Sequence, residues 1–292
     1  MTRKTPKRPG GERTGGQPPR RPLPPQTISS APRDRQRADG KPARTAAPAF
    51  RRPSTDIVAL YGFHAVREAL RAGERSLLDL YATPAAAEKL AAEIAASGVR
   101  LVEASTEDLS RRLGAGAVHQ GALLEARPIA PLDLSEIVQK SGVVLALDQI
   151  TDPHNVGAIL RSAAAFAVDA VVMTERHAPE FSGVLAKAAS GALEHVRLAT
   201  VVNLSRALDE LRDLGYLRVG LDSEGEADLS ATPLSAPLVL VLGGEGKGLR
   251  RLTRENCDLV ARLDMPGEIK SLNVSNACAV ALALVRERLR RA

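Results

Sequence analysis

The feature that most constrains this chain is an apolar run that ends in a cluster of glycines. Five consecutive apolar residues, Leu238–Leu242, lie between Pro237 and Gly243. Such an unbroken run predicts a strand buried on both faces, as in a parallel sheet covered by helices. The glycine cluster GGEGKG at 243–248 would then follow the carboxyl end of a strand, which is where open α/β sheets bind ligands. Because glycine lets the main chain approach a ligand closely, we expect a ligand site here.

Strand and helix patterns alternate along most of the chain, which predicts an α/β fold. Residues 56–127 form a compact α/β unit in this interpretation, with a single helix across 84–97, and 128–142 form a linker. An α/β domain with a parallel sheet is expected from 143 to 292. Its further strands are expected at 143–148, 170–173, 196–202 and 217–221. Helices are expected at 134–140, after an N-cap at Asn155, and at 180–193, 204–214 and 275–291.

The first 53 residues form a basic, proline-rich tail. They hold 11 of the 19 prolines, and 14 Lys and Arg against 3 acidic residues. The rest of the chain is net acidic, with 26 basic and 31 acidic residues. The tail can bury too little apolar surface to offset the entropy of ordering it, which predicts disorder. Its charge fits sequence-independent contact with RNA phosphates, and fits a solubilising extension equally well.

Composition argues against several classes of protein. Aromatic residues make up 2% of the chain and Trp is absent, which disfavours RNA binding by base stacking on exposed rings. Cys257 and Cys278 lack metal-type spacing, which indicates two reduced, buried thiols, and the histidines show no metal-ligand arrangement. No apolar run reaches the roughly 18 residues that span a membrane, and no signal peptide is present. We therefore expect a soluble, cytoplasmic protein without a metal or a membrane.

The glycine cluster matches neither common phosphate-binding loop. The spacing GxxxxGK[ST] is absent, and Gly248 stands where Ser or Thr would bind magnesium. The dinucleotide spacing GxGxxG is absent too, because Arg251 occupies its last position. Local spacing alone fits an ordinary turn between a strand and a helix.

Three separate segments together give a sharper indication. DQITDPHNVGAILRSA at 148–163, LVLVLGGEGKGLRRLT at 238–253 and LDMPGEIKSLNVSNACAVAL at 263–282 resemble the three signature motifs of the SpoU/TrmH family of RNA ribose 2'-O-methyltransferases. They are called here the first, second and third motifs. YGFHAVREAL at 61–70 and GAVHQGALLE at 116–125 are similar to the amino-terminal domain of the members that act on 23S rRNA. The resemblance covers the chain apart from the basic tail.

The resemblance implies a particular fold and a homodimer. Residues 56–127 would be a small α/β domain similar to RNA-binding ribosomal proteins. Residues 143–292 would be a SPOUT α/β domain with a parallel sheet and a trefoil knot near the carboxyl end. General topology rules would otherwise exclude a knot, so this expectation comes from the family alone.

The resemblance also implies the cofactor and the site residues. S-adenosylmethionine would be held mainly by main-chain groups at Gly243, Gly244, Leu263, Met265 and Leu272. Apolar or absent side chains suit an adenine, which binds in a shaped apolar slot with a few backbone hydrogen bonds. The residues matched to catalysis are Asn155, Arg161, Glu245, Ser271 and Asn273. No metal ligand is implied.

The family's usual assignment makes Arg161 the activator of the ribose hydroxyl. A guanidinium has a pKa above about 12 and therefore stays protonated near neutral pH, so two roles stay open for Arg161. Arg161 either loses its proton in a special site, or clamps a phosphate and orients the hydroxyl while another group or water accepts the proton. His154 is interpreted as a loop residue near the RNA without a chemical role. Asp264 replaces a proline that is common in the third motif, so the shape of the cofactor loop is open.

The expected function is methyl transfer from S-adenosylmethionine to a guanosine ribose 2'-hydroxyl in 23S rRNA, either free or in a large-subunit precursor. One alternative is the same chemistry on tRNA, against which the first domain argues. The other is a catalytically silent RNA-binding assembly factor. The presence of Arg161, Glu245 and Asn273 argues against a catalytically silent protein.

Overall fold

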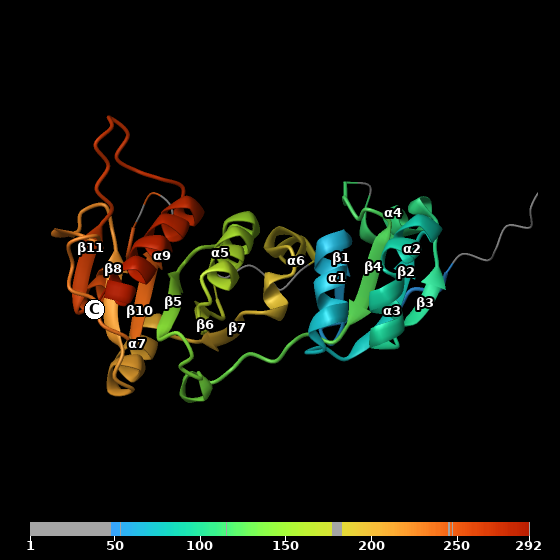
Figure 1. The fold of residues 1–292 in the computed structure, drawn as a ribbon, viewed down its shortest axis with the longest axis horizontal. Helices are drawn as coiled ribbons and strands as arrows, with labels where there is room; N and C mark the ends of the chain where they lie inside the picture. Colours follow the sequence, from blue (N-terminus) through green and yellow to red (C-terminus); the bar gives the residue numbers. More distant parts are fainter. Residues whose placement is uncertain are drawn as a thin grey trace, which may run out of the picture. The chain divides into compact units, whose positions relative to one another are not determined.

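A computed structural model describes most of the chain (Figure 1). The described residues are 48–52, 54–114, 116–176, 183–244, 246 and 248–291. They contain a four-stranded sheet followed along the chain by a seven-stranded sheet.

The four-stranded sheet has the order β1-β4-β2-β3 and mixed pairing. β4 is antiparallel to β1 and β2, whereas β2 and β3 are parallel. The expected single helix at 84–97 is two helices, because Leu90 leaves helical geometry (φ −103°, ψ 8°) and its side chain is fully buried. The elements are β1 Val58–Tyr61, α1 Phe63–Ala72, β2 Leu77–Ala82, α2 Pro84–Lys89, α3 Ala91–Ser97, β3 Arg100–Glu103, α4 Thr106–Leu113 and β4 Ala122–Ala126.

Residues 48–52, which composition assigns to the tail, lie against this small sheet. The ring of Phe50 contacts that of Tyr81, with 4.6 Å between centroids. The Tyr81 hydroxyl donates a hydrogen bond to the carbonyl of Ala49 at 3.0 Å. Arg51 donates from Nε to the buried carboxylate of Asp79 at 3.1 Å. Aromatic packing and an ion pair to a buried carboxylate therefore anchor this segment, although its proline and arginine content predicts disorder.

The seven-stranded sheet is parallel throughout, as the sequence predicts, in the order β7-β6-β5-β10-β8-β11-β9. The predicted strands at 143–148, 170–173, 217–221 and 238–242 all occur, and the strand expected at 196–202 occurs over 197–201. The strands are β5 Val143–Asp148, β6 Ala170–Thr174, β7 Arg197–Val201, β8 Leu217–Leu221, β9 Ala227–Asp228, β10 Leu238–Gly243 and β11 Leu259–Arg262.

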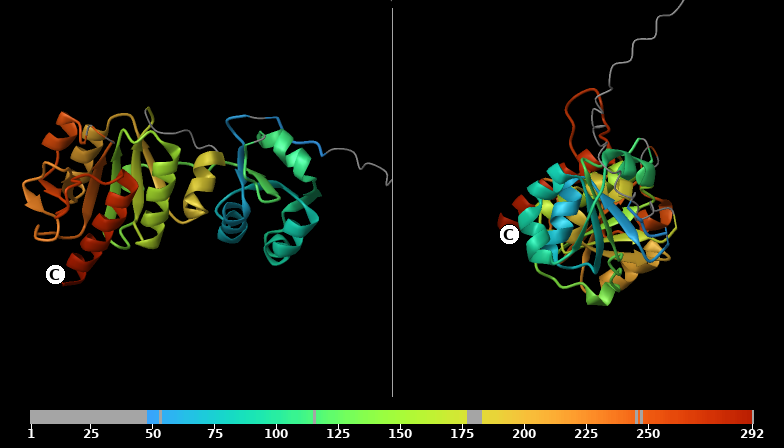
Figure 2. Two further views of the ribbon diagram at one scale, coloured as in Figure 1. Left: turned by 90° about the horizontal axis from the view of Figure 1, so that it is seen from above. Right: turned by 90° about the vertical axis from the view of Figure 1, so that its right-hand side faces the viewer.

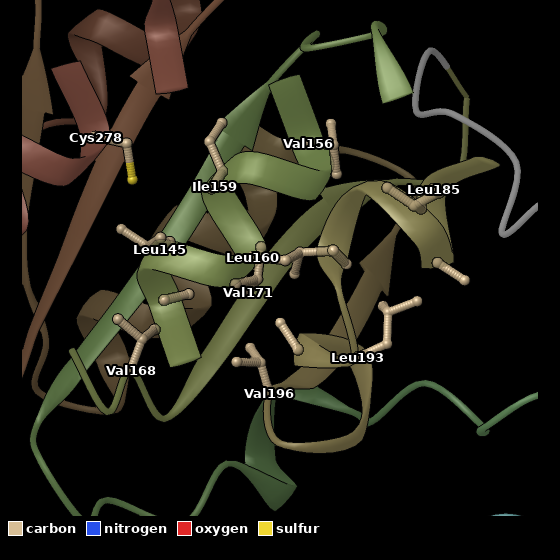
Figure 3. Close-up of a cluster of buried hydrophobic side chains, with 14 of the residues drawn as sticks. Leu145, Val156, Ile159, Leu160, Val168, Val171, Leu185, Leu193, Val196 and Cys278 are labelled. Atoms are coloured by element: carbon tan, nitrogen blue, oxygen red, sulfur yellow. The ribbon is translucent and has the colours of Figure 1, made fainter. Parts of the chain in front are cut away.

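The two faces of this sheet have separate apolar cores, because successive strand residues point to opposite sides. On one face Leu145 and Leu240 pack with residues of α5 (Pro153–Ala165) and α9 (Val274–Arg291), and Figure 3 shows part of this core. On the other face Val144 and Val239 pack with residues of α7 (Leu204–Asp213). α5 and α9 lie side by side (Figures 1 and 2). Burial on both faces explains why these strands lack polar alternation.

Several helix boundaries differ from the prediction. Asp152, not Asn155, caps α5, because Pro153 fits the first helical position and the Asp152 side chain accepts the His154 N–H at 3.0 Å. The helix expected at 180–193 is α6 (Gly183–Ala189) and a 3-10 turn at Ala192–Glu194, and 180–182 lie outside the described residues. The helix expected at 134–140 is a 3-10 turn at Leu134–Glu136. The short helix α8 (Arg251–Glu255) was not expected.

Candidate active site

The candidate site lies where the connections of the large sheet change direction. β6 and β7 lie on one side of β5 in the sheet, whereas β10 and β8 lie on its other side. β5 and β10 are parallel neighbours, and their last residues, Asp148 and Gly243, are paired. A crevice forms at such a switch point, outside the carboxyl ends of the strands. The first motif begins at this edge, and the glycine turn of the second motif lies there.

A cavity of about 420 Å³ opens at this edge, and is called here the cofactor cavity. Its volume falls within the range of small-molecule sites. All five residues expected to hold the cofactor line it, and so does Ser271. The full lining is Leu221, Asp222, Ser223, Glu224, Leu242, Gly243, Gly244, Gly246, Gly248, Leu249, Arg254, Leu263, Met265, Lys270, Ser271, Leu272, Val274 and Ala277.

Gly243 is a glycine because the loop after β10 folds back on it. The Gly248 N–H donates to the Gly244 carbonyl at 3.1 Å, which closes the turn. A Cβ on Gly243 would lie closer than 3.0 Å to backbone atoms of Gly248 and Leu249, a separation that real Cβ atoms essentially never show. A Cβ on Gly244 would lie 2.9 Å from the carbonyl oxygen of Gln149. The bare main chain of this turn therefore forms one wall of the cofactor cavity.

Two carboxylates that sequence reasoning missed hold this turn from either side. Asp148 is buried and accepts hydrogen bonds from the backbone N–H of Arg250 at 3.0 Å and from its Nε at 2.6 Å. Asp222 accepts from the backbone N–H of Leu249 at 3.2 Å and of Glu224 at 3.0 Å. Asp148 ends β5, and Asp222 directly follows β8. An acidic residue at the end of a buried parallel strand was the signal that could have identified both.

The first and third motifs meet through two asparagine side chains. The Nδ2 of Asn273 donates to the Oδ1 of Asn155 at 2.9 Å, and Asn155 is 9% exposed. The Oδ1 of Asn273 accepts from the backbone N–H of Ser275 at 2.9 Å, at the start of α9. Asn273 thus caps α9 and contacts α5 at once. Its neighbours Leu272 and Val274 line the cofactor cavity, so the pair fixes the third motif beside that cavity.

The structure does not bring every expected catalytic residue to the cofactor cavity. Arg161 is exposed on α5 and does not line the cavity of its own chain. Within the described residues its side chain forms no hydrogen bond or ion pair, so its donors are available. Glu245 lies outside the described residues. Asp264 is exposed in an irregular segment between β11 and α9.

Comparison with known proteins identifies the family. The model of the SpoU rRNA methylase family matches residues 142–283. That of the RNA 2'-O ribose methyltransferase substrate-binding domain matches residues 59–132. The chain is 40% identical over 240 residues to the 23S rRNA (guanosine-2'-O-)-methyltransferase RlmB of Ralstonia nicotianae, covering 78% of this chain and 95% of that protein. The chain belongs to the SpoU rRNA methylase family.

Two further relatives of this SpoU methylase extend the comparison. It is 37% identical over 290 residues to an uncharacterized tRNA/rRNA methyltransferase of Mycobacterium avium, covering 96% of this chain and 92% of that protein. The solved AdoMet-bound rRNA methyltransferase from Sinorhizobium meliloti shares the fold, with a TM-score of 0.69 and 24% identity over 80% of this chain and 88% of that one. The family resemblance and the fold class predicted from the motifs are confirmed. The trefoil knot stays a prediction.

The described part of this SpoU methylase shows three further properties. It contains no group of three or more His, Cys, Asp or Glu side chains that could hold a metal ion. None of its helices is long and apolar enough to cross a membrane. Burial raises the pKa of the thiols of Cys257 and Cys278 to about 12, so both are protonated near neutral pH.

Proposed function

We propose that this SpoU methylase transfers a methyl group from S-adenosylmethionine to the ribose 2'-hydroxyl of a guanosine in 23S rRNA or its large-subunit precursor. The observation that carries the proposal is that the second and third motifs line one cavity on the ligand-binding edge of the large sheet, and that the first motif is hydrogen-bonded to the third beside that cavity. The relative from Ralstonia nicotianae is a 23S rRNA (guanosine-2'-O-)-methyltransferase, which supports the choice of 23S rRNA and guanosine.

The cofactor cavity fits S-adenosylmethionine. Gly243 and Gly244 leave a bare main-chain wall that a side chain would fill. Leu263 and Leu272 supply apolar surface suited to an adenine. The charged groups of the lining suit the polar parts of the molecule, and are Asp222, Glu224, Arg254 and Lys270.

When bound, S-adenosylmethionine would supply an electrophilic methyl group: the ribose oxygen would bond to its carbon as the carbon–sulfur bond breaks, S-adenosylhomocysteine would leave, and water or a neighbouring group would accept the hydroxyl proton. The protein's contribution is chiefly to position the two reactants. We propose that the Asn155–Asn273 pair holds Ser271 at the cavity wall, and that Arg161 and Glu245 act on the substrate. Arg161 would clamp a phosphate next to the target ribose, because its exposed guanidinium matches phosphate geometry.

We further propose that residues 56–127 and the basic tail supply RNA affinity, joined to the catalytic domain at 143–292 by the linker 128–142. The tail's 14 Lys and Arg would release counterions from RNA without reading its sequence. The cytoplasm, where rRNA is methylated, is the proposed location.

The test of this function is the transfer of labelled methyl groups into separated 23S rRNA, 16S rRNA and tRNA that lack native methylation. Label is expected in 23S rRNA, on a guanosine ribose. An RNA with 2'-deoxyguanosine at the mapped position should accept none, because it lacks the attacking oxygen. Label in tRNA would support the proposed methyl transfer but would contradict 23S rRNA as the substrate. RNA binding without label in any fraction, including precursor particles, would favour the silent assembly factor.

We propose that the protein is a homodimer. Arg161 lies outside the cofactor cavity of its own chain, and pairing of two chains would allow the Arg161 of one to serve the cavity of the other. Sedimentation equilibrium at micromolar concentration is expected to give twice the chain mass of 30.9 kDa. A monomer mass across that range would contradict the proposal.

A further inference from the structure

A second cavity lies at the same edge of the large sheet and is called here the arginine cavity. Its volume is about 400 Å³. Its lining comes from the ends of β5, β6 and β7 and from the starts of α7 and α8. The lining residues are Gln149, Thr174, Arg176, Val202, Asn203, Leu204, Ser205, Arg250, Arg251, Leu252 and Thr253.

The two cavities adjoin across the glycine turn. Gly244 lines the cofactor cavity and Gln149 the arginine cavity, and a Cβ on Gly244 would lie 2.9 Å from the Gln149 carbonyl oxygen. Leu249 lines the cofactor cavity, and the next residue, Arg250, lines the arginine cavity. The two cavities therefore lie on either side of the glycine turn, so an RNA strand whose target ribose lies at the cofactor cavity could place a neighbouring nucleotide in the arginine cavity.

The charge of the arginine cavity has one sign. Three of its lining residues are arginines and none is acidic. Asp148, beneath Arg250, is buried and bound to the backbone N–H and Nε of that arginine, which fixes the guanidinium in place. Arg251 pairs with Glu255 at 2.6 Å on the exposed side of α8. Arg176 has no hydrogen bond or ion pair from its side chain to any described residue. The three arginines carry more hydrogen-bond donors than the described residues around them have acceptors, so the cavity is suited to an anion.

Two apolar side chains at the arginine cavity are unusually exposed. Val202 is 79% exposed and Leu252 is 54% exposed. Exposed apolar surface beside three guanidinium groups matches the two parts of a nucleotide, the face of the base and the phosphate. A free inorganic anion would leave the apolar surface uncovered.

We propose that the arginine cavity binds the nucleotide next to the methylated one, with its phosphate on Arg176 and Arg251 and its base against Val202 and Leu252. This inference rests on the proposed function and specifies where the RNA strand runs beyond the target ribose. The ligand is single-stranded RNA, because its bases must be unstacked to reach apolar side chains.

The test compares the double variant Arg176→Ala/Arg251→Ala with the wild type in binding a short, fluorescently labelled single-stranded RNA without cofactor. Arg250 is left unchanged because it holds the turn through Asp148. Loss of two phosphate contacts should lower the slope of log K against log salt by about 1.4, since each contact on a single strand contributes about 0.7. We expect the Kd to rise about tenfold at physiological salt, with unchanged S-adenosylmethionine affinity.

The matched control is Arg212→Ala/Arg290→Ala, which removes two exposed arginines at the far end of α7 and at the end of α9. It should leave the Kd and the salt slope unchanged. A double variant that binds RNA as well as this control does, with the same salt slope, would overturn the inference. Failure of the proposed function is distinguishable, because it appears as absent methyl transfer by the wild type whatever the variants bind.

Discussion

Replacing Gly243 by alanine is expected to weaken S-adenosylmethionine binding by up to about 100-fold. The added Cβ would overlap backbone atoms of Gly248 and Leu249, which cannot rotate away as a flexible side chain would. Overpacking of this kind costs about 1–3 kcal/mol, and every 1.4 kcal/mol is tenfold in a binding constant. The turn must shift, and in shifting it moves the wall of the cofactor cavity. Titration calorimetry with S-adenosylmethionine measures the effect directly.

The matched control for this variant is Gly267→Ala. Gly267 lies in the segment between β11 and α9, near the third-motif wall of the cavity, and a Cβ there would meet nothing within 4 Å. It should bind S-adenosylmethionine like the wild type. Thermal melting must show that Gly243→Ala remains folded for the comparison to hold. A folded Gly243→Ala variant with wild-type affinity would show that close approach of the main chain at this position is not part of the cofactor site.

The large sheet was predictable from sequence because its strands are buried on both faces. Residues 143–147 and Leu238–Leu242 are unbroken apolar runs, which are typical of strands buried on both faces. The position of the site followed from the same pattern, because the glycines come directly after such a run. Which residues bind the cofactor or act in catalysis could be predicted only from the family resemblance, because the glycine spacing alone matches no phosphate-binding loop.

The remaining features depend on contacts that sequence spacing does not encode. Asn155 was expected to cap a helix, but the N-cap is Asp152, three residues earlier, and the Asn155 side chain instead accepts a hydrogen bond from Asn273, 118 residues away. The arginine cavity joins Arg176 to Arg250 and Arg251 only because the strand order places the ends of β6 and β10 on either side of β5. Neither could be read from the local sequence.

Replacing Arg161 by alanine is expected to lower kcat for methyl transfer by on the order of 10²–10³, the usual cost of removing a preorganised charged donor. S-adenosylmethionine affinity should change little, because Arg161 does not line the cofactor cavity of its chain. This separates Arg161→Ala from Gly243→Ala, which should lose cofactor affinity first. Single-turnover transfer at saturating RNA and cofactor measures the chemical step, and calorimetry measures the cofactor affinity.

Arg161→Lys distinguishes the two roles that stay open for this residue. In the clamp role a lysine keeps the charge but loses the bidentate fork, so about one tenth or less of the activity should remain, with the pH profile unchanged in shape. In the base role the lysine would lose its proton more easily than arginine, since its reference pKa is about 10.4, and the rate should rise with pH toward that value. We expect the clamp result, because Arg161 is exposed and its donors are available to a phosphate. A lysine variant that matches or exceeds the wild type and follows its own ionisation would instead establish Arg161 as the base.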